Sequence, residues 1–140
     1  MATAKATIDL DVSPDEVWQL IGGFDSLPEW LPYISRSELT DGGRVRHIDN
    51  SDGQTIVERL EKYDSSARTY SYSIVQAPFP VKAYLATITV TSKDGGKKSH
   101  VEWSGRFTPN GISDEEAHNL FQTIFSDGLK ALASMFTSMK

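Results

Sequence analysis

The chain has 140 residues and a mass of 15.5 kDa. We expect a single domain, residues 1–140, that buries about two-thirds of the surface of its unfolded chain. Its 14 Lys and Arg residues are scattered and are outnumbered by 19 Asp and Glu residues, for a net charge of -5, so we expect neither nucleic acid nor an anionic membrane as a partner. Cysteine is absent, which excludes disulfides, thiol redox centres and thiolate metal sites.

The N-terminal segment, MATAKATIDLDVSP, lacks the continuous apolar core of a signal peptide, and no later segment is apolar for long enough to cross a membrane. We therefore expect a soluble, cytoplasmic protein without membrane insertion. Within this segment, residues 4–12 alternate apolar and polar side chains, which predicts a half-buried strand.

Two short helical segments are predicted next. Ser13 and Glu16 form a capping box, and Pro14 suits the first helical position, so a helix begins there. Its candidate inward residues are Val17, Trp18 and Ile21. Two glycines end this helix. The segment at 25–33 holds too many prolines for a long helix and predicts a second short helical turn or a tight loop.

Six strands are predicted between residues 33 and 108. Turn-forming residues separate them at 41–44, 50–54, 63–68, 77–80 and 93–98. Strands joined by such short connections form an antiparallel meander.

A long amphipathic helix follows the last strand. Ser113 and Glu116 form a second capping box, after which apolar residues recur at helical spacing. The predicted apolar stripe comprises Ala117, Leu120, Phe121, Ile124, Gly128, Leu132 and Met135, widened by Phe125, Leu129 and Phe136. A helix of about 25 residues would be roughly 38 Å long and would cross the whole sheet. The order β-α-α-β6-α predicts an α+β domain whose seven strands curl around this helix, with a pocket between them.

Several segments, in this order, carry a family resemblance: SPDEVWQLIGGFDSLPEWLPYI, GRVRHI, ERLEKYD, YSYSI, APFPV, YLATITV and VEWSGRF. Together they span nearly the whole chain, which resembles the START-like helix-grip (SRPBCC) superfamily and, within it, the small bacterial polyketide cyclase/dehydrase and lipid-transport group. The resemblance implies a deep, mostly apolar cavity between a seven-stranded curved antiparallel sheet and the C-terminal helix. Elsewhere in the superfamily this cavity holds lipids, sterols, hormones or polyketides, and some relatives catalyse cyclisation, dehydration or aldol-type steps. No catalytic motif transfers to this chain residue by residue.

Arg46 and Glu58 lie on two strands joined by one turn, each on a face that also carries apolar residues. If those faces point inward, the two side chains meet in the cavity wall. Burial would then raise the pKa of Glu58 and suit it to proton transfer as a general base. The alternative is an ion pair that only shapes the wall. A bulge that reversed the alternation would instead place both at the surface.

Aromatic side chains are the other candidate ligand contacts. Tyr70 and Tyr72 share one face of a strand and serve either as cavity walls with hydroxyl groups or as ordinary core. Trp103 is a core residue or a ligand contact beneath the long helix. Phe121 and Phe125 are candidate ligand contacts on that helix. Two further candidates lie on proline-stiffened segments. Trp30 is a lid residue or a loop anchor, and Phe79 is a gate at the cavity mouth or part of a stiff turn in which a cis X-Pro bond is one option.

The three histidines, His47, His100 and His118, have no metal-pair spacing and no completing carboxylate, so we predict no metal and no cofactor. His118 alone is a candidate acid or base.

The leading hypothesis is a domain that binds a small hydrophobic or aromatic molecule, lipid- or polyketide-like, as a monomer or homodimer. The second is a cofactor-independent cyclase, dehydratase or isomerase with Glu58 as base and Arg46 or Tyr72 stabilising an enolate-like oxygen. The third is a protein-interaction module.

Overall fold

The computed structural model describes residues 1–138, with the side chains of residues 1–136. Its strands are β1 (Ala2–Leu10), β2 (Ile34–Thr40), β3 (Val45–Asn50), β4 (Thr55–Asp64), β5 (Thr69–Gln76), β6 (Val81–Lys93) and β7 (Lys98–Pro109). Its α-helices are α1 (Pro14–Ile21), α2 (Leu27–Trp30) and α3 (Asp114–Ser138). The predicted order of elements is confirmed over the described residues. The first strand lies two residues earlier than predicted, because the chain bends at Asp11 and Val12 towards the cap of α1.

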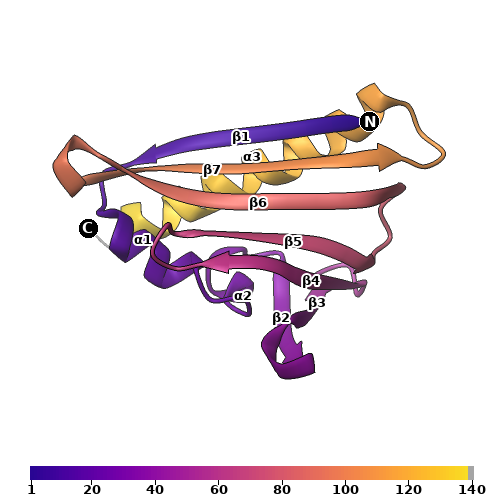
Figure 1. The fold of residues 1–140 in the computed structure, drawn as a ribbon, viewed down its shortest axis with the longest axis horizontal. Helices are drawn as coiled ribbons and strands as arrows, with labels where there is room; N and C mark the ends of the chain where they lie inside the picture. The colour runs from indigo at the N-terminus through magenta and orange to yellow at the C-terminus, as the bar shows by residue number, and fades with distance from the viewer. Residues whose placement is uncertain (139–140) are drawn as a thin grey trace.

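The seven strands form one antiparallel sheet in the order β1-β7-β6-β5-β4-β3-β2. Strands β2 to β7 are a meander, and β1 pairs beside β7 to complete the sheet. Figure 1 shows α3 lying across one face of this curved sheet, with α1 and α2 at one end. Helix α3 packs against β1 and β7, so the predicted α+β helix-grip architecture is confirmed.

The helix starts behave as their sequences predict. The Ser13 hydroxyl accepts a hydrogen bond from the backbone N–H of Glu16 and caps α1. At α3 the capping box is reciprocal: the Ser113 hydroxyl accepts from the Glu116 backbone N–H, and the Glu116 carboxylate accepts from the Ser113 backbone N–H. These bonds satisfy donors that an uncapped helix leaves unpaired.

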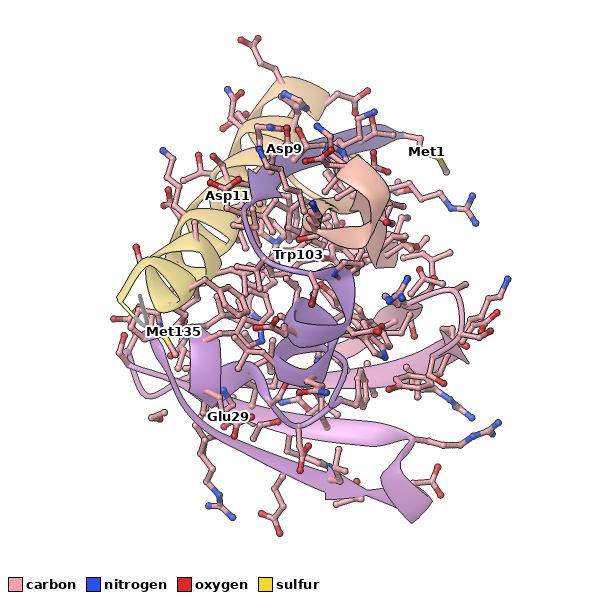
Figure 2. The ribbon with its side chains drawn as sticks, turned by 90° about the vertical axis from the view of Figure 1, so that its left-hand side faces the viewer. Met1, Asp9, Asp11, Glu29, Trp103 and Met135 are labelled. Atoms are coloured by element: carbon pink, nitrogen blue, oxygen red, sulfur yellow. The ribbon has the colours of Figure 1, made fainter. Side chains whose placement is uncertain are left out.

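The core lies between the sheet and α3. Trp103 is buried at the centre of the view in Figure 2, whereas Asp9, Asp11 and Glu29 are exposed to solvent. The Trp103 ring stacks on Phe125 with 4.8 Å between ring centroids. Gly128 makes this arrangement possible, because a Cβ atom there would lie 2.5 Å from the Trp103 ring.

Side chains of α3 cover the outer edge of β1. The Gln122 amide donates to the backbone carbonyl of Lys5 at 2.7 Å and accepts from its N–H at 3.0 Å, as a neighbouring strand would. His118 Nδ1 lies 2.6 Å from the carbonyl oxygen of Thr3. The other edge strand, β2, presents Arg36 and Glu38 to solvent, and exposed charges of this kind disfavour pairing with another strand.

Candidate functional site

A cavity of about 260 Å³ lies between the sheet and α3. Most of its lining is apolar or aromatic. The lining residues are Leu27, Leu31, Tyr33, Ile34, Arg46, Ile48, Asn50, Asp52, Gln54, Ile56, Glu58, Tyr72, Ile74, Phe79, Tyr84, Trp103, Phe121, Ile124 and Phe125. Asp52 and Gln54, in the turn between β3 and β4, are exposed to solvent, so the cavity reaches the surface beside this turn.

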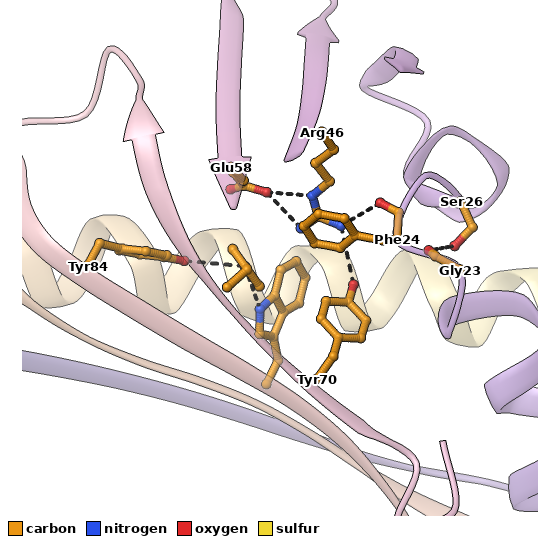
Figure 3. A network of polar contacts seen from close by, with 9 residues as sticks. Gly23, Phe24, Ser26, Arg46, Glu58, Tyr70 and Tyr84 are labelled. Atoms are coloured by element: carbon orange, nitrogen blue, oxygen red, sulfur yellow. Dashed lines mark hydrogen bonds and ion pairs between the residues drawn. The ribbon is translucent and has the colours of Figure 1, made fainter. Parts of the chain in front are cut away.

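Arg46 and Glu58 form a buried ion pair in the cavity wall. They are direct partners in the antiparallel pairing of β3 and β4, so the alternation predicted from the sequence places both inward. Arg46 Nε donates to Glu58 Oε1 at 2.8 Å, and Arg46 Nη2 lies 2.7 Å from the same oxygen. The Arg46 side chain is only 1% exposed. Figure 3 shows both contacts reaching one oxygen of Glu58 while the other oxygen points away from Arg46.

The remaining contacts of Arg46 anchor its guanidinium group. Nη1 donates to the backbone carbonyl of Phe24 at 3.0 Å and lies 3.4 Å from the Tyr70 hydroxyl. The Phe24 and Tyr72 rings lie 4.2 and 4.8 Å from the guanidinium carbon, within the range of cation–π attraction. Arg46 therefore connects β3 to the loop between α1 and α2 and holds Glu58 in place.

Burial determines the protonation of these groups. It raises the pKa of the Glu58 carboxyl, and the adjacent Arg46 guanidinium opposes the rise. For Arg46, burial is the largest single influence and acts to lower the pKa, but the negative charge of Glu58 together with Tyr70 and Tyr72 acts in the opposite direction and the pKa is raised, so the guanidinium stays charged. Burial also raises the pKa of the Tyr72 and Tyr84 hydroxyls, and both are protonated at neutral pH.

A chain of aromatic polar groups lies beside the ion pair. Trp103 Nε1 donates to the Tyr72 hydroxyl at 3.0 Å, and the hydroxyls of Tyr72 and Tyr84 lie 3.4 Å apart. The bond between the two tyrosines uses one of their two O–H donors. The other O–H is therefore available to a carbonyl or hydroxyl group in the cavity.

Seven of the nine predicted site residues line the cavity: Arg46, Glu58, Tyr72, Phe79, Trp103, Phe121 and Phe125. Tyr70 and Trp30 do not. Tyr70 is 2% exposed and lies behind Arg46, where it packs against Phe24 and Trp18. Trp30 is 2% exposed and packs against Trp103, so it anchors its loop in the core and is not a lid.

Phe79 lies where β5 and β6 separate. The two strands pair only as far as Ser73 and Leu85, and the gap between them widens towards their connection (Figure 1). The Phe79 ring lies 5.3 Å from that of Phe121 on α3, and both X-Pro bonds of the connection are trans. Phe79 thus bridges the connection and the helix beside the cavity.

Tyr84 is a cavity residue that the sequence prediction missed. It alternates with Ala86, Ile88 and Val90 on the inward face of β6, so a count of strand parity could have found it. A bulge at Ala83 and Tyr84, where Ala83 has a φ of 52°, interrupts the pairing with β7 and is not apparent from the sequence.

Tyr33 was missed as well. It lines the cavity, and its hydroxyl is buried and finds no hydrogen-bond partner among the described residues. Burial, together with the charge of Asp127, raises the pKa of Tyr33 to about 12. Tyr33 lies in the turn between α2 and β2, where no strand alternation marks the residues that face inward.

The histidines lie outside the cavity lining. His47 contacts Thr40, His100 pairs with Asp9, and His118 contacts the backbone of β1. His118 is therefore not placed to act as an acid or base on a ligand in the cavity. Among residues 1–138, the structure has no group of three or more His, Cys, Asp or Glu side chains that could hold a metal ion.

The sheet, the long helix and the cavity between them define a protein of the START-like helix-grip class. Residues 1–137 match the family described as polyketide cyclase / dehydrase and lipid transport, and the chain belongs to this family. Within the described part of the chain, none of the helices combines the length and the apolar character needed to cross a membrane.

Individual relatives agree with this assignment. MLP-like protein 423 from Arabidopsis thaliana is 30% identical over 124 residues, which cover 79% of each chain. The solved structure of the protein XoxI from Bacillus cereus is 57% identical and superposes with a TM-score of 0.96, over 99% of this chain and 98% of that chain. The Zhui aromatase/cyclase from Streptomyces is 14% identical with a TM-score of 0.75, over 94% of this chain and 88% of that chain, and shows a shared fold.

Proposed function

We propose that the protein binds a small apolar or aromatic molecule, lipid- or polyketide-like, in the cavity between the sheet and α3. The observation that carries this proposal is the cavity itself: about 260 Å³ with a mostly apolar and aromatic lining and a buried charge pair in its wall. A cavity of this kind is the usual form of a small-molecule site. Family membership supports the same proposal. We further propose that residues 1–140 form one domain, active as a monomer or homodimer.

An NMR titration of isotope-labelled protein with naphthalene tests binding. We expect shifts at lining residues such as Ile48, Ile56 and Trp103, and a lower affinity in Ile56→Phe, which fills part of the cavity. Val57→Phe is the matched control, because Val57 is adjacent on β4 but is not a lining residue. If neither naphthalene at its solubility limit nor its hydroxyl or carboxylate derivatives shift any lining residue, the proposal is wrong. Native mass spectrometry then shows whether a cellular molecule co-purifies.

A cofactor-independent cyclase, dehydratase or isomerase is the second candidate. It is favoured by Glu58, a buried carboxylate with an oxygen free of Arg46, which suits a general base. Glu58 would take a proton from the carbon next to a ketone, and the electron pair of the broken C–H bond would move onto the ketone oxygen as an enolate. Arg46 is already bonded to Glu58, Phe24 and Tyr70, so the spare hydroxyl of Tyr72 or Tyr84 is better placed to stabilise that oxygen.

Deuterium exchange into 2-tetralone, a bicyclic ketone with acidic α-protons, tests this chemistry by NMR. We expect exchange with wild-type protein, a loss of at least tenfold in Glu58→Gln, and no change in Glu61→Gln, an exposed carboxylate on the same strand. Only the ionised carboxylate accepts a proton, so the rate should fall as pH decreases through the raised pKa of Glu58. Exchange that persists unchanged in Glu58→Gln would remove Glu58 from the reaction.

The third hypothesis, a protein-interaction module, has weaker support. The large exposed hydrophobic side chains among the described residues are Met1, Leu39, Tyr63 and Val75. Leu39, Tyr63 and Val75 belong to three different strands, and scattered residues of this kind do not mark an interface.

A further inference from the structure

The cavity offers no free cation to a ligand. Arg46 is the one basic residue among the described lining residues. Two of its nitrogens contact Glu58 Oε1, and the third lies against the Phe24 carbonyl and the Tyr70 hydroxyl. An anionic ligand would therefore have to displace Glu58, and a displaced buried carboxylate would lose its counter-ion in a low-dielectric environment.

The cavity does offer an acceptor. Glu58 Oε2 receives no hydrogen bond from the described residues, because both contacts of Arg46 go to Oε1. Figure 3 shows this oxygen directed away from Arg46. Hydrogen bonds to a charged group are stronger than those between neutral groups. A ligand group that donates to Oε2 would therefore gain more than one that accepts at a tyrosine hydroxyl.

The volume of the cavity bounds the part of a ligand that it can enclose. A cavity of about 150 Å³ lined by apolar side chains holds one benzene ring. At about 260 Å³, this cavity holds roughly two fused rings. The rings of Phe121, Phe125 and Trp103 line it and suit a planar aromatic ligand.

We propose that the preferred ligand is an uncharged aromatic molecule of about two fused rings that donates a hydroxyl hydrogen bond to Oε2 of Glu58, and that carboxylates are rejected. This inference rests on the proposed binding function and names the chemistry that the cavity selects. It sets phenol-like molecules apart from the acidic lipids that an apolar cavity would otherwise accept.

Three probes of the same size and different polar groups test the selectivity: 2-naphthol, naphthalene and 2-naphthoate. At pH 7 a naphthol hydroxyl is neutral and a naphthoic acid group is ionised, as the ordinary pKa values of phenols and carboxyls indicate. We expect 2-naphthol to bind about tenfold more tightly than naphthalene, since it adds a hydrogen bond to a charged acceptor. We expect 2-naphthoate to bind at least tenfold more weakly than naphthalene.

Glu58→Gln should reverse the preference between the two polar probes. The variant leaves Arg46 without its counter-ion, so the cation becomes available to 2-naphthoate, while 2-naphthol loses the charged acceptor. Glu61→Gln, on the exposed face of the same strand, should keep the wild-type order. Circular dichroism establishes that each variant is folded. If Glu58→Gln does not fold, the order of the three probes on wild-type protein decides.

The outcomes separate the two proposals. If naphthalene binds and 2-naphthoate binds as tightly as 2-naphthol, the cavity binds ligands but the charge selectivity is refuted. If 2-naphthol binds no more tightly than naphthalene, Glu58 Oε2 is not a ligand acceptor and the inference fails in that respect. If none of the three probes binds, the proposed function fails and the inference with it.

Discussion

The two halves of the inner sheet face meet α3 in different ways. On β1, Ala2, Ala4 and Ala6 face inward, and these small side chains let the helix lie close to the sheet. On β3 and β4, Arg46 and Glu58 face inward and border the cavity instead. The inner face of the sheet is thus covered by α3 at β1 and β7 and borders the cavity at β3 and β4.

This difference indicates what each half contributes. Close packing against β1 and β7 holds α3 in position, because interiors at crystal-like density tolerate little movement. The part of the sheet that borders the cavity, at β3 and β4, lacks that close packing and contains an ion pair instead. A buried ion pair adds little stability compared with a well-packed apolar pair. A polar group retained at such cost in a cavity wall is consistent with a role in recognition, which is the basis of the proposals above.

The largest expected effect is at the ion pair. Arg46→Met removes one partner and leaves Glu58 buried without a counter-ion, so we expect a loss of about 3–5 kcal/mol in the free energy of unfolding. Urea denaturation measures it. The double variant Arg46→Met/Glu58→Met removes both charges and should recover most of that loss. A double variant as unstable as the single one would mean that the pair itself stabilises the fold.

At the contact between α3 and β7, Gly128→Ala is expected to have the next largest effect. A Cβ atom at this position would lie 2.5 Å from the Trp103 ring, so the ring or the helix must move, at a cost of about 1–3 kcal/mol. The measurement is the change in the midpoint of thermal unfolding. Gly23→Ala is the control, since a Cβ there meets nothing closer than 3.4 Å. Equal losses in the two variants would show that the contact with Trp103 is not responsible.

A pair of enlarging substitutions compares the two halves directly. Ala6→Leu adds volume beneath α3 and should cost about 1–3 kcal/mol, whereas Ile56→Phe extends into the cavity and should cost less than about 1 kcal/mol. Urea denaturation of both variants gives the comparison. If Ile56→Phe is the more destabilising change, the cavity does not accommodate added side-chain volume.

The sequence predicted which face of its strand each site residue lies on. It was less successful in predicting which of these side chains reach the cavity. Arg46 and Glu58 were placed correctly because alternation is intrinsic to a strand. Tyr70 and Tyr72 share a face, yet only Tyr72 reaches the cavity, because Phe24 and Trp18 pack over Tyr70. Whether an inward side chain reaches the cavity depends on which other segments pack over it. The periodicity of a single strand carries no information about those segments.

Other features depend on long-range geometry. The bulge at Ala83 and Tyr84 arises from the mismatch between β6 and β7, which no short motif marks. The free oxygen of Glu58 results from the way the Arg46 side chain approaches, and side-chain orientation is set by the surrounding packing. The order of elements was predictable, because capping boxes, turns and hydrophobic period are local properties.

A surface ion pair gives the smallest expected effect and completes the comparison with the buried one. Hydrogen bonds from His100 and then Lys93 lower the pKa of the Asp9 carboxyl, which lies at the protein surface. A lowered pKa in the folded state stabilises the protein above the unfolded value of 3.8, and this contribution is lost as pH falls through the folded value. Asp9→Asn should therefore lower the unfolding temperature slightly at pH 7 and not at pH 2, and added salt should reduce the difference at pH 7. A difference that persists at pH 2 would mean that Asp9 stabilises the fold through contacts other than its charge.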